Sequence, residues 1–372
     1  MKISIFLTKI IKDNLNQTQY EALKKCWIVL TDAICEENSK PIHEIVGSNE
    51  GDALFHSIGY DNPDVLILRW LRARKWDIDA AVQQLMETLK WRKESTVDNL
   101  LLKGENELNL DEIQTNKSYY MGYDKAGRPI SYIHVREHIK DQFPIEQTEK
   151  FGIFSVEIGR KLLKEPIETG TVVIDMSGFG MNNMDYNLVK YFLHLLENFY
   201  PESLGLALII HSPLIFYSCW TVIKHWLDPV IQNKIHFLRN NQDLLEFIHP
   251  SNIPKCLQGN HPDFQYIPPS NEEKTMQKAF YADKQGRKIA RANHRRAARD
   301  YLNITLRWAN GDENLIEERK QATRDLRDTF ERFVPYIHNQ TCYHRIGMID
   351  EPIFNIAYQN LCERNQLNIV QF

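Results

Sequence analysis

Residues 119–135 read YYMGYDKAGRPISYIHV, which is two runs of aromatic and β-branched residues around a turn. The turn segment 124–129 contains Gly127 and Pro129, residue types that favour tight turns, and the flanking runs 119–123 and 130–135 are typical of strands. The stretch predicts a β-hairpin, which contributes an antiparallel pair of strands to a sheet.

The sequence after the hairpin alternates between helical and strand patterns. We expect helices at residues 145–164, 186–199 and 214–227, and strands at residues 171–175, 206–210 and 234–238. Strands separated by helices usually pair in parallel, because a crossover helix returns the chain to the starting edge of the sheet. The predicted fold class is α/β, with a mixed and largely parallel sheet.

The regions on both sides of this pattern read as helical. Apolar residues at helical spacing predict helices at residues 17–33, 64–74 and 78–93. After Gly259 the composition shifts, through several prolines, into charged helical sequence with little strand signal. We expect three parts: a helical N-terminal lobe at residues 1–110, the α/β domain at residues 111–262 and a helical, charged C-terminal extension at residues 263–372.

Composition limits the class of function. The net charge is −4, so the chain as a whole is not built to coat nucleic acid, and we expect no nucleic-acid partner. The six cysteines include no CxxC pair, which suits a reducing cytosol. We interpret residues 1–9 as mature sequence because Lys9 interrupts their apolar run. A cytoplasmic monomer is the expectation.

One uncharged window could be mistaken for a membrane span. Residues 204–223 contain no Lys, Arg, Asp or Glu, but His211, Ser212 and Pro213 lie in the middle of the window. These residues suit a lipid-facing helix poorly. We interpret the window as a buried strand, a turn and an apolar helix.

The C-terminal part contains one strongly basic segment. Residues 284–299 hold seven Lys or Arg and no acidic residue. The residues that share one helical face are Lys284, Lys288, Arg291, Arg295 and Arg299. This face is either a solvated helix surface or a contact for anionic lipid or nucleic acid. A second charged helix is expected at residues 307–335, interrupted at Asn310-Gly311.

Motifs that would carry catalysis are missing. The sequence has no GxSxG, GxxxxGK[ST], HExxH or GxGxxG pattern. His134 and His138 are four residues apart, but the local pattern is strand running into loop, so they need not share a face as metal ligands. We predict no catalytic residue, no metal site and no cofactor.

Four ordered segments resemble a known family. They are LRWLRARKWD at 68–77, GYDKAGRP at 122–129, NFYPESLG at 198–205 and LDPVIQNKI at 227–235. Together they resemble the CRAL-TRIO lipid-binding family, specifically its fungal phosphatidylinositol-transfer branch, over residues 45–262. The resemblance implies a helical N-terminal lobe and an α/β domain whose hydrophobic pocket holds a lipid and is closed by a mobile gate helix.

The apolar helix at 214–227 lies where the family has its gate. Its large side chains are distributed around the helix, so it must be buried or must cover an apolar ligand. Exposure of about thirty acyl methylenes to water would cost ~24 kcal/mol of free energy, at ~0.8 kcal/mol each. A closed pocket removes this cost. The expected gate residues are Ile215, Phe216, Trp220, Ile223, Trp226 and Leu227.

The resemblance also assigns a headgroup site. Glu202 and Lys234 match positions that bind the inositol headgroup, where a carboxylate accepts hydroxyl hydrogen bonds and an ammonium pairs with phosphate. Arg74 and Lys75 match the basic pair beside that site.

The second-ligand positions match less well. Relatives that also bind phosphatidylcholine carry hydroxyl residues where this sequence has Gly180 and Asn182, and a tyrosine where it has Ser131; only Tyr120 is retained. We therefore expect phosphatidylinositol alone or with an unknown second ligand.

These expectations define a phospholipid carrier that is not an enzyme. The expected partners are phosphatidylinositol, a transient membrane surface and a lipid kinase or other lipid-modifying enzyme. The alternatives are a carrier or sensor of a sterol, a tocopherol-like molecule or haem, a lipid hydrolase, and a scaffold that acts through residues 284–299.

Overall fold

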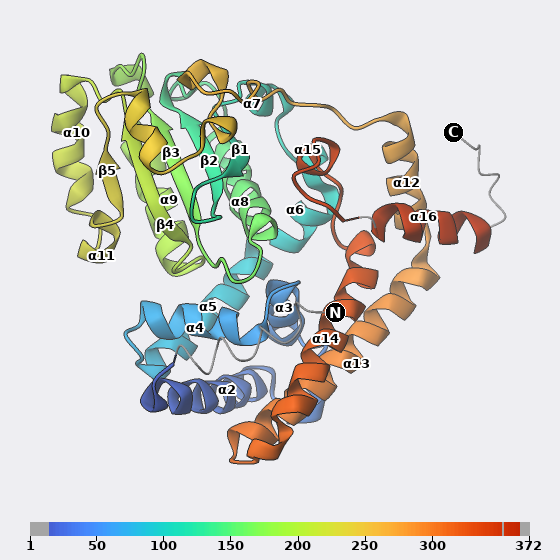
Figure 1. Ribbon diagram of the computed structural model, residues 1–372. Coiled ribbons are helices and arrows are strands. Elements are labelled where there is room, and N and C mark those ends of the chain that lie inside the picture. The colour runs from blue at the N-terminus through green and yellow to red at the C-terminus, as the bar shows by residue number, and fades with distance from the viewer. Residues whose placement is uncertain (1–14, 352, 365–372) are drawn as a thin grey trace. The chain divides into compact units, whose positions relative to one another are not determined.

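The computed structural model describes residues 15–351 and 353–364, and these form two compact units (Figure 1). The sheet unit comprises Lys103–Ser270 and Gln340–Asp350. The helical unit comprises the described residues up to Leu102, together with Asn271–Asn339 and those from Glu351 onward. The expected mature segment 1–9 lies outside the described residues.

The sheet unit is built on five strands in sequential order. β1 pairs antiparallel with β2, and β3, β4 and β5 follow in parallel. Their bounds are β1 Ser118–Tyr123, β2 Pro129–His134, β3 Gly170–Asp175, β4 Leu204–Ile210 and β5 Ile235–Phe237. The predicted hairpin and the predicted mixed, largely parallel sheet are confirmed.

Asp124 explains why the hairpin turn forms. Its Oδ1 accepts hydrogen bonds from the backbone N–H groups of Ala126 and Arg128, at 2.9 Å each. Its Oδ2 accepts from Arg128 Nε and from Thr171 Oγ1 of β3, at 2.7 Å each. One carboxylate thus holds the turn and joins it to the next strand of the sheet.

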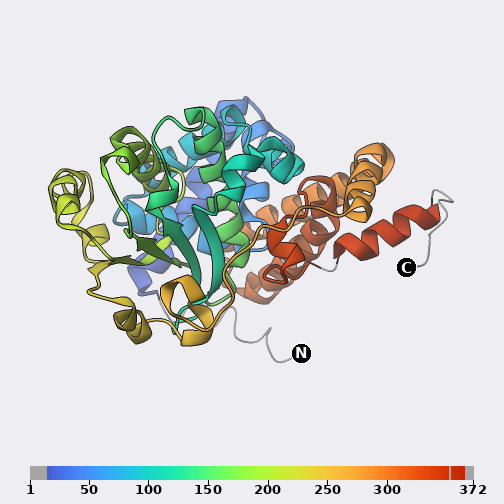
Figure 2. The same ribbon diagram turned by 90° about the horizontal axis from the view of Figure 1, so that it is seen from above.

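Crossover helices cover one face of the sheet (Figures 1 and 2). A sheet that advances by one strand at each right-handed crossover places every crossover helix on the same side. The covering helices are α8 Ile145–Leu162, α9 Tyr186–Asn198 and α10 Leu214–Lys224, with the short α11 Pro229–Gln232 after them. We call this side of the sheet the helix face.

The chain after β5 covers the opposite face. There Leu244, Ile248, Ile253 and Leu257 pack with strand residues such as Tyr132 and Leu208 in one buried apolar cluster. The unit is completed by two short helices, α7 Leu110–Gln114 and α15 Cys342–Arg345. We call this side the sealed face.

The helical unit combines helices from both ends of the sequence. Buried residues of the N-terminal helices share one apolar core with residues such as Tyr301 and Leu326. The helices are α2 Gln17–Asn38, α3 Asn49–Ile58, α4 Pro63–Ala73, α5 Ile78–Glu94, α6 Val97–Lys103, α12 Asn271–Ala282, α13 Lys284–Ala309, α14 Ile316–Phe333 and α16 Ile353–Arg364. Residues 297–326 of the predicted C-terminal extension 263–372 therefore share a core with the N-terminal helices.

A buried polar network joins these helices. The Arg319 guanidinium of α14 donates to Asp64 Oδ2 at 2.7 Å and to Thr305 Oγ1 at 2.9 Å. The Trp27 indole N–H donates to Asp64 Oδ1 at 2.8 Å. The network satisfies the charges of Asp64 and Arg319 where water is excluded, and it fixes α14 against α2 and α4.

The uncharged window 204–223 forms β4 and the greater part of α10, as predicted. Among residues 15–351 and 353–364, no helix has both the length and the apolar character needed to cross a membrane.

Candidate functional site

The two faces of the sheet differ in how well their side chains are buried. Along β3, Thr171, Val173 and Asp175 point to the sealed face and are buried, whereas Val172 and Ile174 point to the helix face and are only half-buried. Ile133 and Tyr120 on neighbouring strands are also half-buried. The helix face thus keeps a partly accessible surface at these positions, whereas Ser131, Ala207 and Ile209 on the same face are buried.

Small residues bring helix α8 close to this surface. A Cβ placed on Gly159 would lie 2.4 Å from the Tyr120 hydroxyl, and one on Gly152 would lie 2.0 Å from the Phe192 ring of α9. These distances are too short for any larger side chain unless the neighbours move. Glycine at both positions therefore allows α8 to pack closely on Tyr120 and on α9.

Helix α10 is buried on one side only. Phe216, Cys219 and Ile223 repeat at helical spacing and are buried against the helix face. The outer side is exposed and still apolar. Its exposed fractions are 90% for Leu214, 47% for Ile215, 47% for Tyr217 and 44% for Val222.

The other expected gate residues lie between these two sides. Trp220, Trp226 and Leu227 are half-buried at the edge of the same apolar cluster. The helix ends at Lys224, so Trp226 and Leu227 lie in the turn that follows it. Gln232 of α11 donates hydrogen bonds to the carbonyls of Lys224 and Leu227 at 3.1 and 2.9 Å, which closes this turn.

The structure brings Glu202 and Lys234 together. Glu202 lies in the turn before β4 and Lys234 directly precedes β5, and these strands are neighbours. The Lys234 carbonyl accepts a hydrogen bond from the Ala207 N–H at 2.8 Å, and Lys234 Nζ lies 3.7 Å from Glu202 Oε2. Both side chains keep part of their surface in solvent, at 22% for Lys234 and 32% for Glu202. The pair thus occupies the amino-terminal edge of the parallel strands.

The second-ligand candidates divide into two places. Tyr120 and Ser131 are directly opposite each other in the β1–β2 pair and point to the helix face. Gly180 and Asn182 lie in the loop after β3, at the carboxyl-terminal edge of the sheet. That edge is opposite the one that carries Glu202 and Lys234.

Arg74 and Lys75 belong to the helical unit. They follow α4 at its C-terminal end, where Lys75 has a positive φ of 52°. Arg74 is half-buried and Lys75 is exposed.

Sequence reasoning missed a polar cluster at the carboxyl-terminal edge of the sheet. Asp175 Oδ1 lies 2.6 Å from Ser177 Oγ and 2.8 Å from His211 Nδ1, and Asp175 Oδ2 lies 3.2 Å from His134 Nδ1. Burial alone would raise the pKa of Asp175, but hydrogen bonds from both histidines and from Ser177 hold that pKa well below its usual range. The signal in the sequence was the set of polar residues at the ends of three successive strands.

This cluster is not a catalytic triad. His211 Nδ1 lies 2.8 Å from Asp175 Oδ1 and also 2.8 Å from Ser177 Oγ. A general base needs one ring nitrogen for the carboxylate and the other for the hydroxyl, so that a proton can pass through the ring. The geometry therefore orders the loops that follow the strands and does not activate Ser177.

Within the described part of the chain, no three His, Cys, Asp or Glu side chains are grouped as a metal site would require. His134 and His138 are separated by the short 3₁₀ helix Val135–Glu137.

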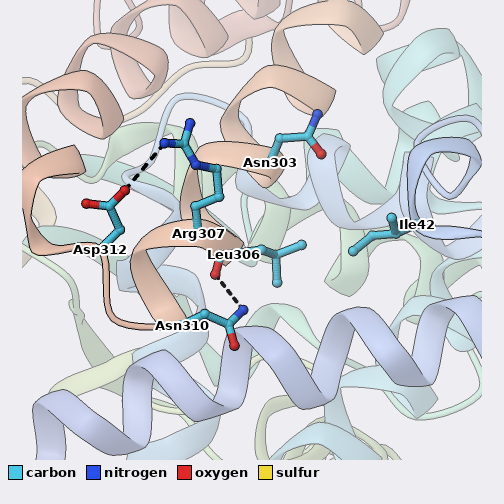
Figure 3. Close-up of a pocket in the computed structure, with 6 residues that line it drawn as sticks. All are labelled: Ile42, Asn303, Leu306, Arg307, Asn310 and Asp312. Carbon is cyan, nitrogen blue, oxygen red and sulfur yellow. Dashed lines mark hydrogen bonds and ion pairs between the residues drawn. The ribbon is translucent and has the colours of Figure 1, made fainter.

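A surface pocket of about 530 Å³ lies in the helical unit, and none of the residues that line it is a predicted site residue (Figure 3). Arg307 and Asp312 form an ion pair across 3.4 Å, and Asn310 Nδ2 donates to the Leu306 carbonyl at 2.8 Å. The residues that line the pocket are Ile42, Asn303, Leu306, Arg307, Asn310 and Asp312. The polar groups of Arg307, Asn310 and Asp312 are thus already engaged within the pocket.

Two segments of the sequence match models of known protein families. Residues 113–259 match the CRAL/TRIO domain, and residues 11–87 match the CRAL/TRIO N-terminal domain. The chain belongs to the CRAL/TRIO family, a class of proteins that bind lipids.

Particular relatives are more informative than the class. A CRAL-TRIO domain-containing protein of Schizosaccharomyces pombe is 36% identical over 303 residues, which is 79% of this chain and 67% of the relative. The phosphatidylinositol transfer protein CSR1 of Eremothecium gossypii is 32% identical over 84% of this chain and 74% of its own. The Sec14 cytosolic factor of Schizosaccharomyces pombe is 30% identical over 53% of this chain and 74% of its own.

Among solved structures, the crystal structure of Sfh5 is similar, with a TM-score of 0.47 and 19% identity. The similarity covers 60% of this chain and 83% of Sfh5.

Proposed function

We propose that the protein carries one molecule of phosphatidylinositol on the helix face of its sheet, and exchanges it with membranes or presents it to a lipid-modifying enzyme such as a lipid kinase. The observation that carries the proposal is the unequal burial of the two faces of the sheet. Val172, Ile174 and Ile133 stay half-buried although helices cover them, and an apolar ligand would complete their burial.

The dimensions of the sheet suit such a ligand. An acyl chain is about 15 Å long, since two of them span a hydrocarbon core of about 30 Å. The seven residues of β4 extend over about 23 Å at ~3.3 Å per residue. A headgroup at the amino-terminal edge would therefore leave room for the acyl chains along the helix face.

Glu202 and Lys234 have the chemistry for the headgroup. The Lys234 ammonium would pair with the phosphate, and the Glu202 carboxylate would accept hydrogen bonds from inositol hydroxyls. Their own ion pair of 3.7 Å is loose and partly solvated, so a phosphate can compete for Lys234 at small cost.

Helix α10 is proposed to act as the gate. Leu214, Ile215 and Val222 expose apolar surface that water does not stabilise, and Tyr217 adds an aromatic ring with a polar hydroxyl, which suits a membrane interface. Contact with a bilayer would bury this outer side and let α10, with Phe216 on its inner side, move away from the sheet. The lipid could then leave without crossing water.

We propose a carrier without catalytic activity. The shared Nδ1 contact in the cluster of Asp175, Ser177 and His211 supports this, because it provides no proton relay. The names of the relatives favour a phospholipid over a sterol, a tocopherol-like molecule or haem. A cytoplasmic protein in peripheral contact with membranes is consistent with a relative named as a cytosolic factor.

Transfer of labelled phosphatidylinositol between two vesicle populations tests the proposal. Lys234→Ala and Glu202→Ala are expected to lower the transfer rate at least tenfold, because each removes a charge-assisted contact to the headgroup. Lys255→Ala is the matched control, since Lys255 is an exposed lysine of the same unit outside the proposed site. Equal rates in all three variants would contradict the headgroup assignment, and no transfer by the unmodified protein would contradict the function.

A further inference from the structure

The first half of helix α13 presents a cationic surface that the proposed lipid pocket does not use. In a chain of net charge −4, residues 284–299 carry seven positive charges and no negative ones. Lys284, Lys288 and Arg291 are exposed, and their spacing places them on one side of the helix. Arg287 lies beside them and is half-buried.

These charges are not neutralised within the described part of the chain. No carboxylate there comes within 4.0 Å of Lys284, Arg287, Lys288 or Arg291, whereas Arg295, further along the helix, pairs with Asp52. The nearest acidic residue in sequence, Asp283, is already engaged. Its Oδ1 accepts from the Gly286 N–H and its Oδ2 from the Tyr336 hydroxyl, at 2.9 Å each.

Arg287 gives a second observation that points to an anion. Its Nε is buried and has no hydrogen-bond partner among the described residues. Burial lowers the pKa of Arg287, and the neighbouring charge of Arg291 lowers it further. Two guanidinium groups held close together without an anion are unfavourable, so a bound anion would stabilise this surface.

The surroundings of the cations favour a lipid bilayer as the anion. Tyr281, at the end of α12, is 43% exposed and lies near Arg287. An exposed tyrosine beside a basic helix face is the residue type that enters a membrane interface, where cations pair with phosphate headgroups.

We infer that residues 281–299 form a docking surface for an anionic bilayer, separate from the lipid-binding face of the sheet. This surface would attract the protein to membranes that contain acidic phospholipids, whatever lipid the sheet unit carries. The attraction is electrostatic and is screened by salt, since the Debye length falls from about 10 Å at 0.1 M to about 3 Å at 1 M.

Flotation of the full chain with vesicles tests the inference, using phosphatidylcholine vesicles with and without phosphatidylserine. We expect phosphatidylserine to strengthen binding, and Lys288→Gln with Arg291→Gln to weaken it about 25-fold, because each basic residue near an anionic surface contributes about fivefold. The matched control is Lys25→Gln with Lys93→Gln, which removes two exposed lysines of the same unit that have no ion pair among the described residues. Lys284→Gln with Lys288→Gln replaces the first variant if that one does not fold.

Three results would overturn the inference. They are equal binding to both kinds of vesicle, equal weakening in the control variant, and binding of an RNA or DNA duplex that the α13 substitutions abolish while vesicle binding persists. Failure here differs from failure of the proposed function, because the α13 variant should keep its bound phosphatidylinositol and Lys234→Ala should keep its binding to phosphatidylserine vesicles.

Discussion

At the scale of single residues, the candidate headgroup pair contributes little to the fold. Lys234 and Glu202 are partly solvated and 3.7 Å apart, so their attraction contributes less than about 1 kcal/mol to the free energy of unfolding. Loss of lipid in a variant at Lys234 would therefore report on binding and not on unfolding.

The residue roles were predictable to different degrees. Glu202 and Lys234 lie on segments 32 residues apart, and only the resemblance to a family suggested that they meet. The cluster around Asp175 was missed because its members come from three strands, and hydrogen-bond partners across strands leave no local periodic signal.

His294 is buried in the neutral form, and this makes stability depend on pH. Only 2% of its surface is exposed, its ring packs against those of Phe330 and Phe333, and burial lowers its pKa to about 4. A histidine whose folded pKa lies below its unfolded value of about 6.5 contributes stability above pH 6.5 and loses it as the pH falls towards 4.

We expect the helical unit to lose about 2 kcal/mol of stability between pH 7 and pH 5 through this residue. Thermal unfolding of the full chain and of His294→Gln across this range measures the effect. The groups around the ring that also titrate are His56 and Asp52, and they are the same in both proteins. An identical slope in the two proteins would refute the assignment.

At the scale of elements, the two sides of helix α10 have different roles: the buried side contributes to stability, and the exposed side is proposed to contact membranes. The sequence predicted its position to within three residues at its C-terminal end, but not its orientation, because its apolar side chains surround the helix and any side could face inward. The structure selects Phe216, Cys219 and Ile223 as the inner side.

Substitutions on the two sides of α10 should therefore act differently. Ile215→Ser with Val222→Ser should slow lipid transfer several-fold and leave the melting temperature nearly unchanged, because both side chains are about half exposed. Phe216→Ala should cost about 3–5 kcal/mol of unfolding free energy, because Phe216 is 6% exposed and its removal leaves a cavity. Lipid transfer between vesicles measures the first effect, and thermal unfolding measures the second. Equal loss of stability in both variants would mean that α10 is simply a core helix.

At the scale of the whole molecule, the C-terminal helices are part of the fold. The sequence predicted that residues 284–335 are helical and charged, but it could not show that Arg319 pairs with Asp64, since 255 residues separate them. Arg319 also contacts the Trp308 ring, with its guanidinium carbon 4.2 Å from the ring centre. Buried charges of this kind have no surface-like periodicity by which they could be recognised.

Breaking the buried pair should destabilise the helical unit strongly. Arg319→Met leaves the Asp64 carboxylate without its cation and is expected to cost about 3–5 kcal/mol in unfolding free energy. Adding Asp64→Asn removes the unpaired charge and should recover part of the loss. Chemical denaturation of the two variants is the measurement, with Arg296→Met as an exposed control. If Arg319→Met were as stable as Arg296→Met, the Arg319–Asp64 pair would not contribute to the stability of the fold.

The packing of the C-terminal helices on the N-terminal helices also changes what is expected from a C-terminal truncation. Under a scaffold function, removal of the chain from Pro269 onward would leave lipid transfer intact. Because α13 and α14 share a core with α2, α4 and α5, that truncation would instead expose buried apolar residues such as Trp27 and Leu30. Point variants are therefore the appropriate way to examine the C-terminal region.

The central claim is that the protein encloses phosphatidylinositol beside Lys234. It is tested most directly by extracting the purified full chain with organic solvent and identifying the bound lipid by mass spectrometry, for the unmodified protein, Lys234→Ala and Lys255→Ala. We expect phosphatidylinositol in the unmodified protein and in Lys255→Ala, and its loss from Lys234→Ala while the melting temperature is retained. A different hydrophobic molecule present in all three proteins would contradict it.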